Sequence, residues 1–203
     1  FAVWGDRRPA ALTTGTAFTP PEQPVRRTET MAVNQSKLVM GFRVGIADPD
    51  EACMAARLMN ALFGGTPHSM LFRSVREKLS LCYYASSQTD KLKGVIAVAS
   101  GIENESEPKA RQEILHQLED MQSGGLTAEE VEAAKRSVTA SLRTMFDTPL
   151  ALENFYQTQA AAGLDETLEH LIARIEQVTV EDVTRAAQKA VPDTVYFLKG
   201  AGA

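Results

Sequence analysis

The chain has 203 residues, of which 44% are hydrophobic and 23% are charged. This is an ordinary globular composition, and it excludes a disordered or collagen-like protein. The 21 basic residues against 26 acidic ones give a formal net charge of −5, which argues against a general surface for nucleic acid or anionic membranes.

The cysteine content and the lack of long apolar runs bear on the compartment. Cys53 and Cys82 are the two cysteines of the sequence, too few for a disulfide framework, so a reducing compartment is favoured. No apolar run approaches the roughly 18 residues that a membrane-spanning helix needs. We therefore expect a cytoplasmic protein that contacts neither membrane nor nucleic acid.

Residues 1–27 are predicted to form an extended linker. Prolines stand at positions 9, 20, 21 and 24, and each of them fixes φ and removes a backbone donor. Because the chain opens on Phe1 rather than Met and enters this segment at once, we expect a piece of a longer protein. Residues 28–203 are predicted to form one domain, the C-terminal half of that protein.

The periodicity of apolar residues between positions 28 and 102 predicts a strand, two helices and a hairpin. In chain order these are a strand over 28–46, a helix from Asp48 to the glycine pair Gly64-Gly65, a helix over 69–78, and strands over 81–89 and 95–102. Asp48 is expected to cap the first helix, with Pro49 in its first turn.

The second half of the chain is predicted to be mostly helical. Helices are expected over 108–123, 127–146, 149–162, 165–177 and 180–190, followed by a strand over 194–198. Thr127 and Glu130 form a capping box at the start of one helix, and Thr179 is expected to cap another. These elements predict an α+β fold, with a mostly antiparallel sheet and helices packed on one face.

The sequence carries no complete metal or nucleophile motif. His68, His116 and His170 are far apart, and Asp120 stands where a second histidine would complete an H-x-x-E-H zinc motif that His116 begins. Cys82 has no histidine placed beside it by sequence and is interpreted as a half-buried strand cysteine. No metal site is therefore expected in this chain.

Arg76 and Tyr83 are the candidate substrate-binding residues. Arg76 falls in the last turn of the helix over 69–78, and Tyr83 falls near the start of the next strand. A guanidinium and a phenol at one corner can donate hydrogen bonds to a peptide carbonyl or an oxyanion. The alternative is structural: Arg76 caps carbonyls or pairs with an acid, and Tyr83 packs in the sheet.

This stretch resembles the C-terminal half of the pitrilysin-type zinc peptidases, which include insulin-degrading enzyme and the mitochondrial processing peptidase. The family pattern is a double-glycine turn, a helix of the type S-x-L-F-x-x-V-R-E-K, and then L-x-Y. The matching residues are Gly64, Gly65, Leu71, Phe72, Val75, Arg76, Glu77, Lys78, Leu81 and Tyr83. Ser80 departs from the pattern, because many members have glycine there.

The resemblance implies a substrate-chamber domain of a zinc metalloendopeptidase. In that family the N-terminal half carries H-x-x-E-H and holds zinc, while the C-terminal Arg and Tyr reach the substrate; here these are Arg76 and Tyr83. The chain alone is expected to be inactive and to hold no cofactor, with zinc supplied by the parent protein. The expected partners are a peptide or small protein substrate and an N-terminal zinc-type domain or a zinc-bearing paralogue, in a homodimer or heterodimer.

Three further interpretations remain open at this stage. The Tyr83-Tyr84-Ala85-Ser86-Ser87 run, together with Ser100-Gly101-Ile102-Glu103 after the hairpin, resembles a bacterial subgroup that lacks a working zinc motif and is associated with modification of elongation factor P. A member of the same fold can also be a non-catalytic scaffold or regulatory partner. The third alternative is a helix-rich interaction domain unrelated to peptidases, in which Arg76 and Tyr83 point to unrelated surfaces.

Overall fold

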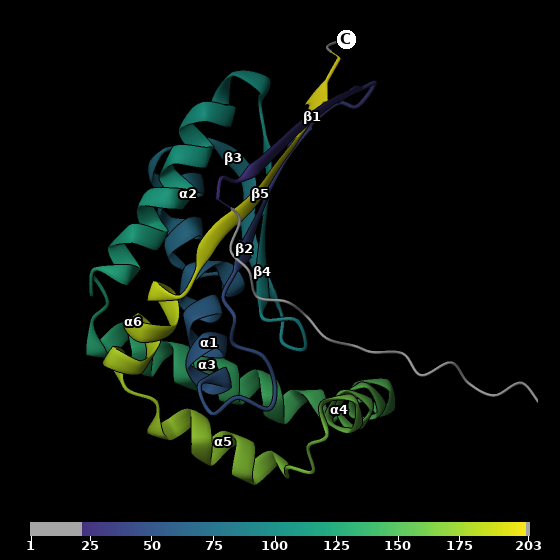
Figure 1. Ribbon diagram of the computed structural model, residues 1–203, viewed down its shortest axis with the longest axis vertical. Helices are drawn as coiled ribbons and strands as arrows, with labels where there is room; N and C mark the ends of the chain where they lie inside the picture. Colours follow the sequence, from purple (N-terminus) through teal and green to yellow (C-terminus); the bar gives the residue numbers. More distant parts are fainter. Residues whose placement is uncertain (1–21, 202–203) are drawn as a thin grey trace, which may run out of the picture.

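The computed structural model describes residues 22–201, which form one five-stranded sheet with helices against it (Figure 1). The strands are β1 (Val25–Met31), β2 (Ser36–Arg43), β3 (Cys82–Asp90), β4 (Val95–Ile102) and β5 (Val191–Gly200). The helices are α1 (Cys53–Asn60), α2 (Glu107–Gln122), α3 (Ala128–Met145), α4 (Pro149–Ala162), α5 (Leu168–Gln177) and α6 (Val180–Gln188). Two π-helical turns, η2 (Ala61–Gly65) and η3 (Phe72–Lys78), and a 3₁₀ turn, η4 (Asn104–Ser106), complete the described elements.

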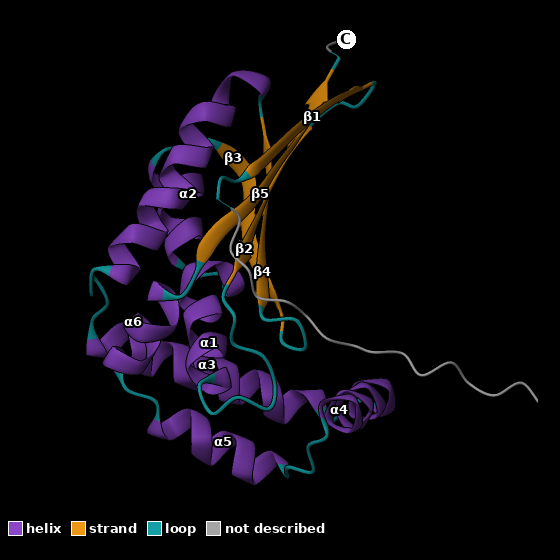
Figure 2. Cartoon of the chain, viewed as in Figure 1, coloured by secondary structure: helices purple, strands orange, loops and turns teal. Residues whose placement is uncertain are grey.

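The sheet has the strand order β1-β5-β2-β4-β3. Within residues 22–201, β1 pairs with β5 in parallel, and the other three strand pairings are antiparallel. The last strand of the chain thus lies between the first two. The helices pack against one face of this sheet (Figure 2), so the predicted α+β class and its mostly antiparallel sheet are confirmed.

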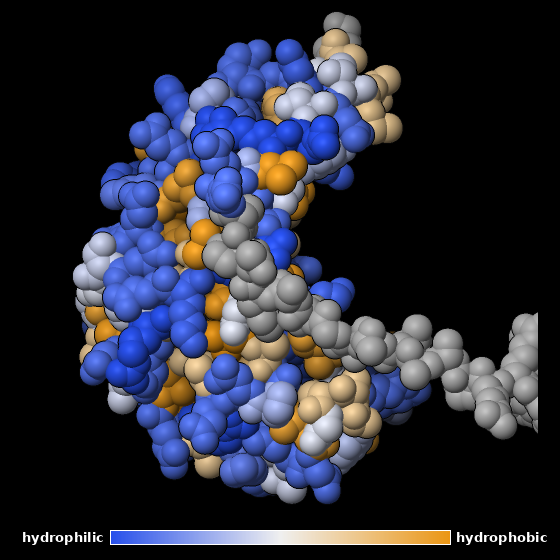
Figure 3. All heavy atoms as spheres, in the orientation of Figure 1, coloured by the Kyte–Doolittle hydropathy of each residue, from blue (hydrophilic) through white to orange (hydrophobic). Residues whose placement is uncertain are grey.

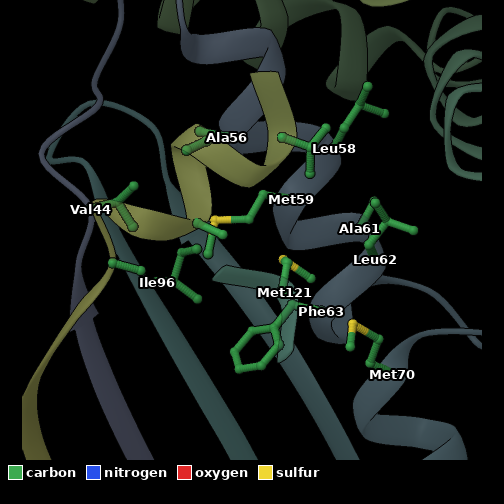
Figure 4. Close-up of a cluster of buried hydrophobic side chains, with 14 of the residues drawn as sticks. Val44, Ala56, Leu58, Met59, Ala61, Leu62, Phe63, Met70, Ile96 and Met121 are labelled. Atoms are coloured by element: carbon green, nitrogen blue, oxygen red, sulfur yellow. The ribbon is translucent and has the colours of Figure 1, made fainter. Parts of the chain in front are cut away.

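The core lies between this face of the sheet and the helices. Alternation along β2 directs Leu38, Met40 and Phe42 inward, and each is at most 2% exposed. Figure 4 shows the inward side chains of the sheet meeting those of α1 and η2. The rings of Phe42 and Phe63 pack edge to face, with centroids 6.0 Å apart. Burying each such side chain contributes about 1.5–3 kcal/mol.

The predicted helix starts at positions 127 and 179 are confirmed. The Thr127 hydroxyl accepts a hydrogen bond from the Glu130 amide, and the Glu130 carboxylate accepts one from the Thr127 amide. Thr179 and Asp182 make the same reciprocal pair at the start of α6. Both boxes satisfy amide groups that the first turn of a helix leaves without an intrahelical partner.

The prediction was wrong at two places in the first part of the chain. The expected strand over 28–46 is two strands, β1 and β2, and β1 begins at Val25, inside the predicted linker; residues 1–21 of that linker lie outside the described residues. The first helix begins at Cys53 rather than next to Asp48. The Asp48 amide donates to the Lys91 carbonyl, and its carboxylate lies 3.5 Å from Lys91 Nζ, so Asp48 binds the β3–β4 turn instead of capping a helix.

The opposite face of the sheet is left uncovered by the helices of residues 22–201 (Figure 2). Small residues occupy one outward position of β2, Gly41, and three outward positions of β4, Ala97, Ala99 and Gly101. A side chain at position 101 would meet the Tyr84 ring at 2.6 Å, which shows how closely that ring packs on β4. Figure 3 shows that the molecule is concave between the strand ends and the α4 end. None of the described helices is long and apolar enough to cross a bilayer.

Candidate functional site

The corner between η3 and β3 carries Arg76 on one side and Tyr83 on the other. The wide turn of η3 ends where the Leu79 amide donates to the Ser74 carbonyl and the Leu81 amide donates to the Val75 carbonyl. Between them Ser80 adopts a left-handed conformation with φ of 50°. This is the position at which the related family often has glycine, and a left-handed residue is what allows the chain to leave the helix and enter β3.

A β-bulge places Tyr83. Cys82 pairs with Ile102 and Tyr84 pairs with Gly101, so Tyr83 is an extra residue that faces no partner on β4. The Tyr83 side chain is 62% exposed, rather than packed in the sheet. Bulges of this kind re-aim a side chain, and they are common both on edge strands, of which β3 is one, and beside functional sites.

The Tyr83 hydroxyl donates a hydrogen bond to Glu103 Oε1 at 2.9 Å. This hydrogen bond raises the pKa of Tyr83, because the carboxylate stabilises the protonated phenol. Sequence reasoning did not assign Glu103 to the site. The predicted hairpin could have identified it. When the strands over 81–89 and 95–102 pair as a hairpin, Glu103, which follows the second strand, lies opposite the start of the first strand, where Tyr83 is.

Arg76 is exposed on η3, and its guanidinium carbon lies 4.7 Å from the centre of the Phe72 ring. A cation held over an aromatic face gains about 0.5–1 kcal/mol at an exposed site. Within residues 22–201, Arg76 makes no ion pair with an acid and no hydrogen bond to Tyr83. Because Arg76 is exposed, its N–H donors are accessible to a ligand.

The glycine pair fixes η2 against β3. Gly64 is buried, and a Cβ atom on it would lie 2.7 Å from the amide nitrogen of Ser87. The Ser87 hydroxyl donates to the Asn60 side-chain oxygen at 2.8 Å and also contacts the Asn60 carbonyl. The pair thus ends η2, as the sequence indicated that it ends the first helical segment, and Gly64 packs directly on the strand that carries Tyr83.

The other candidate groups do not form a reactive centre. Burial raises the pKa of Cys82, and it raises the pKa of Cys53 to about 12, so both cysteines are protonated at neutral pH. His68, His116 and His170 are exposed on separate elements. Among residues 22–201, no three His, Cys, Asp or Glu side chains are grouped so as to hold a metal ion. The described residues therefore do not fit the zinc ion that the resemblance implies.

Comparison with known proteins matches residues 5–138 to the family described as the peptidase M16 inactive domain. The chain is 39% identical over 168 residues to "Probable inactive metalloprotease YmfF" of Bacillus subtilis, and 26% identical over 173 residues to "Uncharacterized zinc protease YmxG" of the same organism. These alignments cover 83% of this chain but only 39% and 41% of the relatives, so the chain spans about two fifths of their length.

Among solved structures, the chain is similar to a conserved protein from Enterococcus faecalis V583, with a TM-score of 0.84 and 31% identity. That alignment covers 91% of this chain and 44% of the other. The matched family region includes the corner between η3 and β3 and ends within α3. The chain belongs to the peptidase M16 inactive-domain family, the C-terminal type of half in pitrilysin-like zinc peptidases.

Proposed function

We propose that this chain forms one wall of the substrate chamber of a zinc-peptidase-like protein, with Arg76 and Tyr83 as donors to a bound peptide. The observation that carries the proposal is the exposure of both donors at one corner of the fold. Arg76 makes no ion pair within the described part of the chain, and the bulge lifts Tyr83 out of the ladder.

The two donors suit a peptide carbonyl. A guanidinium presents several N–H groups in a fixed plane, and a phenol presents one O–H group. The Tyr83 hydroxyl donates a hydrogen bond to Glu103 Oε1 at 2.9 Å, which holds the phenol in place. A bound peptide would have to compete with Glu103 for this one O–H group. Arg76 has no acidic partner in the described part of the chain, and a donor that is free in this way can stabilise developing negative charge without first breaking another bond.

Zinc would have to be held outside residues 22–201, in the remainder of a longer protein or in a zinc-bearing paralogue. The name of the relative YmxG, a zinc protease, supports the presence of zinc in related full-length proteins. The same name supports a peptide or small protein as the substrate, and we propose a homodimer or heterodimer as the assembly.

The second candidate is a non-catalytic scaffold or regulatory partner of a zinc-bearing paralogue. It is favoured by the relative named as a probable inactive metalloprotease, which is the more similar of the two Bacillus subtilis proteins. The association with elongation factor P modification stays a prediction of this second candidate.

Peptide cleavage by the full-length protein, alone and with a zinc-bearing paralogue, tests the two candidates. We expect Arg76→Ala and Tyr83→Phe each to lower kcat/KM by about 100-fold to 1,000-fold, the loss typical of removing one such donor. Arg143→Ala and Tyr156→Phe, which change an exposed arginine on α3 and an exposed tyrosine on α4, are the matched controls. Unchanged cleavage in both site variants would remove the two residues from the mechanism, and a wild-type protein that never cleaves would favour the scaffold.

A further inference from the structure

Arg57 on α1 is a partly buried cation without an acidic partner. Within residues 22–201 its guanidinium makes no hydrogen bond and no ion pair. Burial lowers the pKa of Arg57, although the charge on Asp48 acts in the opposite direction. Guanidinium groups removed from water are normally paired or hydrogen-bonded, so this arrangement requires an explanation.

The nearby acids are committed to other partners. Asp48 lies 3.5 Å from Lys91 Nζ and is also hydrogen-bonded to the Cys53 thiol. Glu166 forms an ion pair with Arg174 and lies 3.5 Å from His170 Nδ1. Neither carboxylate comes within ion-pair distance of Arg57 in the described part of the chain.

A hollow of about 340 Å³ opens beside Arg57, between the end of α1 and the middle of α3. Its lining residues are Arg57, Asn60, Ala61, Gly65, Thr66, Pro67, Ser137, Val138, Ser141, Leu142 and Met145. The lining contains one cation and no acidic residue, while the charges of Asp48 and Glu166 act on Arg57 from outside this hollow. A hollow of this size falls in the range that encloses small organic ligands, which is about 300–1,000 Å³.

Some polar side chains of the hollow already make hydrogen bonds within the protein, and others do not. Thr66 donates to the Ala61 carbonyl, and the Asn60 side-chain oxygen accepts from Ser87. Ser137 and Ser141, one turn apart on α3, donate no hydrogen bond to any residue of the described range. The lining of the hollow thus includes Arg57 and two hydroxyl donors, and it contains no carboxylate.

The remaining wall is apolar and consists chiefly of Val138, Leu142 and Met145. A single cation suits a monoanion better than a dianion, and an apolar wall suits a ligand with a hydrocarbon body. A larger hollow of about 470 Å³ between α1, α5 and α6 makes a weaker case, because its arginines, Arg174 and Arg185, are already paired with acids.

We propose that the hollow between α1 and α3 binds a small organic carboxylate, whose carboxylate group pairs with Arg57 and whose apolar body lies against Val138, Leu142 and Met145. Two sources share this chemistry, a free carboxylic acid and the C-terminus of a peptide. The proposal is independent of the role of Arg76 and Tyr83, because it uses none of the groups at their corner.

Isothermal titration calorimetry on the full-length protein tests the proposal with hexanoate, hexanamide, N-acetyl-leucine and inorganic phosphate. We expect hexanoate or N-acetyl-leucine to bind, and hexanamide and phosphate to bind at least about tenfold more weakly, since a hydrogen bond to a charged group contributes about 1.5–3 kcal/mol. Tighter binding of N-acetyl-leucine would identify the source as a peptide C-terminus, and tighter binding of hexanoate would identify it as a free acid.

Three variants locate the site. Arg57→Met removes the charge while keeping an unbranched side chain, and Ser141→Phe fills the mouth of the hollow while leaving Arg57 intact. Both should weaken carboxylate binding at least about tenfold by removing a charge-assisted bond or the space for the ligand. Ala140→Phe changes an exposed neighbour on α3 that does not line the hollow, and it should bind as the wild type does.

The proposal is overturned if neither carboxylate binds, if hexanamide binds as tightly as hexanoate, or if phosphate alone binds. It is also overturned if Ser141→Phe, shown to be folded by its circular dichroism spectrum, retains wild-type affinity. Because Ser141 is exposed, this variant keeps the test decisive even if Arg57→Met fails to fold.

Discussion

Replacing Gly64 with alanine should be strongly destabilising, because there is no room for a methyl group where η2 packs on β3. The added Cβ would lie 2.7 Å from the Ser87 amide nitrogen, 2.8 Å from its Oγ and 2.9 Å from its Cβ. The closest of these atoms belongs to the backbone of a strand that is paired with β4. A flexible side-chain end could move aside, but this strand cannot do so without disturbing its ladder.

The expected loss combines two effects. Overpacking a well-filled interior costs about 1–3 kcal/mol. A shift of Ser87 would also weaken its hydrogen bonds to Asn60, at 2.8 and 3.2 Å, and a buried hydroxyl left unsatisfied costs about 1–3 kcal/mol. Because a displaced Ser87 can keep part of this bonding, we expect Gly64→Ala to lower the free energy of unfolding by about 2–4 kcal/mol.

Urea denaturation followed by circular dichroism measures this loss, with Gly41→Ala as the matched control. The nearest atom to a Cβ on Gly41 is the Thr194 Cβ, at an ordinary contact distance of 3.8 Å. The control should therefore be neutral or slightly stabilising, since alanine restricts the unfolded chain. If Gly64→Ala stays within about 0.5 kcal/mol of the wild type, or if both variants lose equally, the steric argument is refuted.

Two further predictions concern the corner that carries Tyr83. Ser80→Gly should raise the free energy of unfolding by about 0.5–1 kcal/mol in urea denaturation, because Ser80 has φ of 50° and glycine adopts that region without strain; a loss of stability would contradict this. Glu103→Gln should lower the pKa of Tyr83 toward its usual value, which can be followed by tyrosinate absorbance. The control is Glu29→Gln, which should leave the pKa of Tyr83 unchanged and lower that of Tyr196, because Tyr196 donates to Glu29 at 2.9 Å. Because the folded pKa of Tyr83 is the raised one, the stabilisation from this hydrogen bond is fully present below the unfolded pKa and is lost as the pH rises through the folded pKa. An unchanged titration in Glu103→Gln would show that the carboxylate does not hold the phenol.

Elements that are specified by neighbouring residues were predicted well. The capping box of Thr127 and Glu130 sets the start of α3, and the strand predicted over 95–102 is β4. Each of these signals lies within a few residues of the feature it determines, so the sequence contains it in readable form.

Features set by distant partners could not be predicted in this way. The start of β1 depends on its pairing with β5, in which Val25 lies opposite Thr194. The start of α1 depends on Asp48, which is held by Lys91 on the β3–β4 turn. In both cases the local pattern of apolar residues did not fix where the element begins, and a contact with a residue far along the chain determined its first residue.

The candidate site also combines features that neighbouring residues determine with features that distant contacts determine. Sequence spacing identified Arg76 and Tyr83 and placed them at one corner, but it did not show that Tyr83 is exposed. Ala85 and Ser87 point into the core, so regular alternation along β3 would turn position 83 inward as well. The bulge between Cys82 and Tyr84 inserts one residue and reverses that alternation. The accessibility of the phenol, on which the proposed function depends, is therefore a property of how β3 pairs with β4 and cannot be read from the motif alone.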